Sequence, residues 1–140
     1  MPEDTPQPVP PVPPGPPASV LVIDDNMDTA DSLARFLRIA VGHEVRVAYD
    51  GAAGMRMVTE RAPDVVVCDI AMPKLSGLRV ADALAQLTPK PLLIAVTAFA
   101  GEFPEARARE AGFDFYLAKP ADPFVVEALI QNRGRQTNGH

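Results

Sequence analysis

The 140-residue chain contains one cysteine and no tryptophan. A single cysteine, Cys68, excludes an intramolecular disulfide framework. Because Cys68 follows three valines, we interpret its thiol as a small buried hydrophobe in a protein of a reducing compartment.

Basic residues and long apolar runs are also scarce. The chain has 13 Lys and Arg against 18 Asp and Glu, for a net charge of −5. Nucleic-acid binding needs clustered basic residues, so nucleic acid is not an expected partner. No apolar run approaches the roughly 18 residues of a membrane span. The N-terminus is acidic where a signal peptide is basic and then apolar. We therefore expect a cytoplasmic protein without a membrane partner.

Proline is the residue in excess, with 16 in the chain and nine of them before residue 18. Residues 1–18 have too little apolar surface to form a core, which predicts a disordered or polyproline II segment. Its PxxP spacings allow docking to an aromatic groove, but we favour a solvated segment. We expect one domain at 19–132 and a flexible tail at 133–140.

Three runs, at 20–23, 65–68 and 92–96, are continuously apolar, which is typical of parallel strands buried on both faces. An alternating stretch at 45–47 predicts an edge strand, and 115–117 predicts a fifth strand. Helical spacing between these runs predicts five helices. We therefore expect an α/β fold, flavodoxin-like, with a doubly wound five-stranded parallel sheet of order 2-1-3-4-5.

The first and last predicted helices have apolar faces that should cover this sheet. Ala30, Leu33, Ala34, Leu37 and Val41 recur at helical spacing in the first. In the last, which Asp122 caps and Pro123 begins, we expect Val125, Ala128 and Leu129 to point inward.

Polar side chains stand where four of these strands end: Asp24 and Asp25, Asp69, Thr97 and Lys119. Ligands bind at the carboxyl ends of strands in such sheets. Each residue has an ordinary explanation. On that explanation the acidic pair would cap a helix, Thr97 would be an ordinary strand residue, and Lys119 would be a solvated amine. Because all of them stand at one edge of the sheet, together they predict a ligand-binding or catalytic site there.

Three carboxylates and one ammonium group have a definite chemistry. Two carboxylates about 4 Å apart repel by roughly 4 kcal/mol at an effective dielectric constant near 20, so the cluster needs a counter-charge. Lys119 supplies one positive charge, and a hard cation such as Mg²⁺ supplies the rest. An Asp can attack phosphorus to form an aspartyl phosphate, and charge neutralisation then lowers most of the barrier. The residues therefore predict an aspartate phosphoacceptor.

At this point the chain resembles the receiver domain of two-component response regulators, of the chemotaxis-regulator type. The likeness spans 19–132 and rests on Ile23-Asp24-Asp25-Asn26, Asp69-Ile70-Ala71-Met72-Pro73 with Gly77, Thr97-Ala98 and Lys119-Pro120. One departure is Ser76, where Asp or Asn is common, and it concerns only the hydrogen bonding of the loop.

The resemblance implies a role for each of these residues. Asp69 would be the phosphoacceptor. Mg²⁺, or Mn²⁺ in its place, would be bound by Asp25, Asp69 and the carbonyl of Ala71, with Asp24 assisting through water. Lys119, ahead of a cis Pro120, would pair with the phosphoryl group.

The resemblance also implies partners and a switch. Thr97 and Tyr116 would be the switch pair. The donor would be a sensor histidine kinase or a histidine phosphotransfer protein. The target would bind through the fourth helix, fifth strand and fifth helix, on a monomer or weak homodimer. Ala71 and Phe99 would flank the path of the hydrolytic water. Neither hydrogen-bonds water, so we expect a long-lived phosphoryl group.

Three other functions remain open at this stage. A flavodoxin-type electron carrier shares the topology, but Asp24 and Asp25 would repel its cofactor phosphate. A haloacid-dehalogenase-type phosphatase would have an acid at Ala71. A receiver that is never phosphorylated would act only as a docking module. We interpret His43 as a surface imidazole, and neither His43 nor His140 as a metal or phosphotransfer group.

Overall fold

The computed structural model describes residues 17–73 and 75–133. Its ten elements alternate along the chain: β1 (Ser19–Ile23), α1 (Met27–Val41), β2 (Glu44–Ala48), α2 (Gly51–Glu60), β3 (Val65–Asp69), α3 (Gly77–Leu84), β4 (Leu92–Thr97), α4 (Glu105–Ala111), β5 (Phe115–Ala118) and α5 (Pro123–Gln131). The predicted tail lies outside these residues apart from Arg133, as do His140 and residues 1–16 of the proline-rich segment.

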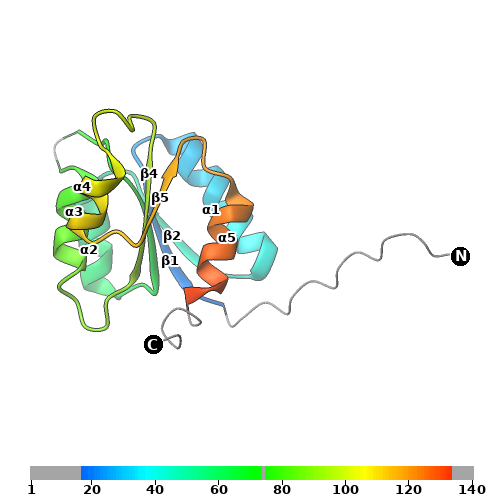
Figure 1. The fold of residues 1–140 in the computed structure, drawn as a ribbon. Coiled ribbons are helices and arrows are strands. Elements are labelled where there is room, and N and C mark those ends of the chain that lie inside the picture. The colour runs from blue at the N-terminus through cyan, green and yellow to red at the C-terminus, as the bar shows by residue number, and fades with distance from the viewer. Residues whose placement is uncertain (1–16, 74, 134–140) are drawn as a thin grey trace, which may run out of the picture.

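The five strands form one parallel sheet in the order β2-β1-β3-β4-β5, which confirms the predicted fold. Helices α1 and α5 cover one face, and α2, α3 and α4 cover the other (Figure 1). Within the described residues, no helix is long and apolar enough to cross a membrane.

The core is divided into two layers because successive strand residues point to opposite faces. Leu21, Val66 and Leu93 pack under α2–α4, whereas Val20, Val65 and Ile94 pack under α1 and α5, and all six are fully buried. This double burial is the physical reason for the continuous apolar runs. Cys68 belongs to the first layer, and burial raises the pKa of its thiol.

The helix ends follow the expected capping chemistry. The carboxylates of Asp50 and Asp122 accept hydrogen bonds from backbone N–H groups in the first turns of α2 and α5. Gly42 and Gly112 end α1 and α4 at φ of 81° and 119°, in the left-handed region that glycine favours.

The predicted inward face of α5 is wrong by one residue. Val126 and Ile130 are fully buried, whereas Val125 is 41% exposed and Ala128 is exposed; only Leu129, which is half-buried, keeps its expected contact with the core. The helix is apolar almost all round, so its spacing alone is compatible with more than one face.

The prediction that His43 is a surface imidazole is also wrong, because His43 is only 3% exposed. Its Nδ1 accepts a hydrogen bond from the backbone N–H of Ala18 (2.9 Å), so Nε2 carries the proton and donates to Glu127 Oε1 (2.8 Å). Glu127 comes from α5, 84 residues later. Ala18, assigned from sequence to the proline-rich segment, is itself buried.

Candidate functional site

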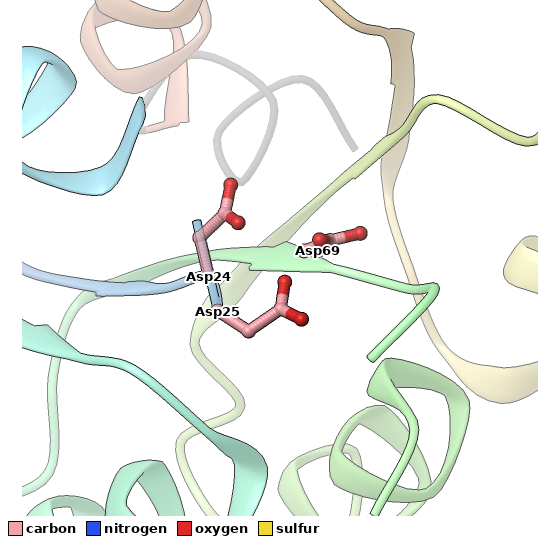
Figure 2. Close-up of side chains that lie close together, drawn as sticks. All are labelled: Asp24, Asp25 and Asp69. Carbon is pink, nitrogen blue, oxygen red and sulfur yellow. The ribbon is translucent and has the colours of Figure 1, made fainter. Parts of the chain in front are cut away.

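The residues singled out at the strand ends meet at one edge of the sheet. Asp24 and Asp25 follow β1, Asp69 is the last residue of β3, Thr97 is the last of β4, and Lys119 follows β5. Because β3 lies between β1 and β4, these ends are neighbours. Figure 2 shows the three carboxylates grouped at the ends of β1 and β3.

One carboxylate oxygen from each of Asp24, Asp25 and Asp69 lies within 4.8 Å of the others. Asp24 and Asp69 are buried, each 5% exposed, whereas Asp25 faces solvent. The N-cap of α1 is Asn26, whose side chain accepts from the N–H of Thr29 (3.0 Å). The acidic pair is therefore not needed as a helix cap.

Lys119 bridges the two buried carboxylates. Its Nζ lies 3.0 Å from Asp24 Oδ2 and 3.2 Å from Asp69 Oδ2, and its side chain is 17% exposed. The second oxygen of Asp69, Oδ1, accepts from the N–H of Ala71 (3.0 Å). Lys119 is thus the counter-charge of the cluster and not a solvated amine.

Burial raises the pKa of Asp69, and the negative charge of Asp24 raises it further, while Lys119 and the Ala71 N–H act in the opposite direction. Burial alone would lower the pKa of Lys119, but its hydrogen bond to Asp24 and the charges of Asp69 and Asp24 raise it overall. One ammonium group therefore does not compensate the carboxylates fully, and the cluster favours a further cation.

This pKa shift predicts how the stability of the metal-free protein depends on pH. A raised carboxyl pKa means that the ionised Asp69 lowers stability above its folded-state pKa. We therefore expect Asp69→Asn to raise the free energy of unfolding at pH 7 in EDTA. The gain should shrink as the pH falls through the folded-state pKa toward the ordinary value of 3.8. Urea titrations across this range measure it.

Asp82→Asn is the control for this experiment, because Asp82 is exposed on α3. It removes the same charge and should leave the urea midpoint nearly unchanged. A parent protein more stable than Asp69→Asn at pH 7 without metal would contradict the explanation.

The donor set fits a hard divalent cation, because it consists only of oxygen atoms and carries an excess negative charge. Asp25, Asp69 and Ala71 line an open hollow of about 420 Å³, with Asn26, Thr29, Ala98, Phe99 and Lys119. An exposed Asp25 leaves room there for water and for phosphate oxygens.

Sequence reasoning did not single out Asn26, Thr29 and Ala98 as walls of this hollow. Their position in the chain, next to or near Asp25 and Thr97, could have indicated that they line the site. Phe99 lines the hollow and is 53% exposed.

Thr97 and Tyr116 lie on neighbouring strands. Thr97 pairs with Ala118, and Tyr116 with Ala95, so both side chains are on the α2–α4 face. Thr97 is buried, and its hydroxyl oxygen accepts from the N–H of Phe99 (2.9 Å). The Tyr116 hydroxyl donates to the carbonyl of Phe103. Both hydroxyls are thus bonded to the loop that joins β4 to α4.

Two loop features bear on the resemblance. The Lys119–Pro120 peptide bond is cis, as expected. Ser76 is the N-cap of α3, and among the described residues its side chain makes no capping hydrogen bond.

Comparison with known proteins matches residues 20–131 to the response regulator receiver domain. PrrA of Mycobacterium tuberculosis, a transcriptional regulatory protein, is 40% identical over 122 residues, covering 82% of this chain and 51% of PrrA. MprA of Mycobacterium avium, a response regulator, is 33% identical over 111 residues, which cover 79% of this chain and 47% of MprA. The chain thus spans about half the length of these curated relatives.

Solved structures of receiver domains have the same fold. A receiver domain from Clostridium thermocellum has a TM-score of 0.77 at 31% identity, covering 88% of this chain and 99% of that one. A CheY-like receiver from Methanospirillum hungatei has a TM-score of 0.79, but at 24% identity it supports the fold alone. The family match, the relatives and the fold lead to one conclusion: the chain belongs to the response regulator receiver domains of two-component systems.

Proposed function

We propose that Asp69 accepts the phosphoryl group, in a Mg²⁺-dependent reaction in which Mn²⁺ substitutes. The observation that carries this proposal is the position of the Asp69 carboxylate. It lies buried within reach of Asp24 and Asp25, and Lys119 Nζ pairs with one of its oxygens. We take 19–132 as the receiver domain, with residues outside it as flanking segments.

In this proposal an Asp69 oxygen forms a bond to phosphorus while the P–N bond of a phosphohistidine breaks. The electron pair of that bond passes to the departing imidazole nitrogen. Lys119 stays beside Asp69 and offsets the charge of the phosphoryl oxygens. Mg²⁺, held by Asp25, Asp69 and the Ala71 carbonyl with Asp24 assisting, would neutralise the remaining charge. Positioning and charge therefore supply most of the catalysis.

The signal would leave through the β4–α4 loop. Phosphorylation adds nearly two negative charges beside Thr97. We infer that the Thr97 hydroxyl exchanges the Phe99 N–H for the phosphoryl group, and that Tyr116 exchanges the Phe103 carbonyl for an inward position. Two hydroxyls bonded to one loop support this role as a switch.

The donor in this proposal is a sensor histidine kinase or a histidine phosphotransfer protein, and the target binds the surface of α4, β5 and α5. We propose a monomer or weak homodimer that does not itself bind nucleic acid. The reduced, buried Cys68 supports a cytoplasmic location.

Metal dependence tests the proposal directly. With acetyl phosphate as donor, intact-mass spectrometry should show the gain of one phosphoryl group in Mg²⁺ or Mn²⁺ and none in EDTA. The reason is that the uncompensated carboxylates repel the incoming phosphate. A chain that gains no group with any donor, at any Mg²⁺ concentration, is instead a receiver that acts only as a docking module.

The lifetime of the phosphoryl group is a second expected result. Ala71 and Phe99 line the hollow, and neither side chain positions water for in-line attack. One restored polar contact of about 1.4 kcal/mol is worth tenfold in rate. We expect Ala71→Asn with Phe99→Glu to speed loss of the group about tenfold or more, measured as decay of the phosphorylated mass.

Ile39→Glu is the matched control, since Ile39 is 74% exposed on α1 outside the hollow. It should leave the decay rate of the parent unchanged. An unchanged or slower decay in the double variant would rule out this account of the lifetime.

A further inference from the structure

A second cavity adjoins the phosphoacceptor site on the face of the sheet that α1 and α5 cover. It measures about 500 Å³ and lies between α1 and the β5–α5 connection. Its apolar walls come from the sheet, from α1 and from that connection: Val22, Val67, Val96, Leu33, Ala121 and Pro123. It shares Thr29, Asp69 and Lys119 with the phosphoacceptor hollow, but Asp25, Ala71 and Phe99 line the hollow alone.

The cavity exists because α1 presents short side chains at this level. Thr29 and Ser32 line it from the first two turns of α1. One turn further along, Phe36 meets Phe124 of α5 edge to face, with ring centroids 4.9 Å apart. Side chains at a contact set the distance between helices, so this ring pair contributes to the spacing of α1 and α5 next to the cavity. The space is left unfilled.

Its chemistry is that of a small-molecule site. Such sites are mostly apolar, measure roughly 300–1,000 Å³ and carry a few polar groups. Three carboxylates, Asp24, Asp28 and Asp69, line the cavity with one ammonium group, that of Lys119. Lys119 is already paired with Asp24 and Asp69. Asp28 is exposed, and it forms no ion pair with any residue in 17–73 or 75–133.

We propose that this cavity binds a small organic amine. The apolar body of the amine lies on Val22, Val67 and Val96, and its ammonium group pairs with Asp28 at the rim. An anion is disfavoured, because the lining has three negative groups against one positive. A metal ion at the phosphoacceptor site would offset the charges of Asp24 and Asp69, but Asp28 lies outside that cluster and would keep its negative charge at the rim. The inference does not depend on the proposed function.

Titration of the full chain with 2-phenylethylamine, followed by amide chemical shifts and without any phosphodonor, tests the proposal. For about ten non-hydrogen atoms we expect a dissociation constant of about 0.1–1 mM. The shifts should concentrate on α1 and residues 119–123. Phenylacetate, which has the same ring but a negative charge, should bind at least about tenfold more weakly.

Variants separate the cavity from the surface around it. Ser32→Leu places an isobutyl group in the cavity and should weaken binding of the amine at least about tenfold; Ala121→Leu does so from the opposite wall. Ala40→Leu adds the same group at an exposed position of α1 outside the cavity. This variant should bind the amine with the affinity of the parent. Asp28→Asn should weaken the amine several-fold but leave binding of uncharged 2-phenylethanol unchanged.

The proposal is overturned if the parent shows no saturable shift up to about 10 mM amine, or if both filling variants bind as the parent does. Equal affinity for phenylacetate would overturn the assignment of an amine. None of these results bears on whether Asp69 accepts a phosphoryl group.

Discussion

Replacing Asp69 by asparagine is expected to abolish phosphoryl acceptance, with a rate loss of more than about 1000-fold. The amide has no anionic oxygen to attack phosphorus, and such a loss corresponds to more than about 4 kcal/mol of activation free energy. Intact-mass spectrometry with acetyl phosphate and Mg²⁺ measures the loss.

Asp82→Asn again provides the matched control, and it should be phosphorylated like the parent. Thermal unfolding should show that Asp69→Asn remains folded, so that a lost reaction is not a lost fold. An Asp69→Asn chain that still gains one phosphoryl group at a comparable rate would contradict the assignment of the phosphoacceptor.

Replacing Gly77 by alanine is expected to lower the free energy of unfolding by about 2–3 kcal/mol. The added Cβ would lie 2.4 Å from the carbonyl oxygen of Asp69 and 2.8 Å from the Cα of Ile70. Both are backbone atoms, so β3 or the start of α3 must move. This clash outweighs the gain of about 1 kcal/mol that alanine normally brings to a helix. Urea titration measures the change.

Gly101→Ala is the control, since a Cβ there meets no atom within 4 Å. We expect it to change stability by less than about 0.5 kcal/mol. Because Gly77 lies against the backbone of Asp69, Gly77→Ala should also weaken Mg²⁺ binding, whereas Gly101→Ala should not. Equal urea midpoints for the two variants would show that the β3–α3 connection is more adaptable than its geometry indicates.

Much of this protein follows from the order of its residues. Strands buried on both faces need continuous apolar runs, and crossover helices force parallel pairing, so the runs at 20–23, 65–68 and 92–96 determine the sheet. Parallel strands end at one edge. The sequence therefore also predicts that Asp24, Asp25, Asp69 and Lys119 meet, and in the structure these four side chains lie close together.

Other features depend on contacts between residues far apart in the chain. Local spacing in α5 is compatible with several inward faces, and only its packing on the sheet buries Val126 and Ile130. A single histidine in a turn looks solvated, but α5 covers His43 and brings Glu127 to it.

The cavity between α1 and the β5–α5 connection is likewise a result of tertiary structure. It is lined by residues of β1, α1, β3 and β4 and of the segment 119–123, which come together only in the folded chain. The sequence by itself thus determined the elements, their order and the residues at the strand ends, because these depend on local spacing and chain connectivity. Only the tertiary structure decided what lies against α5, since burial there is a property of surfaces that meet after the chain has folded.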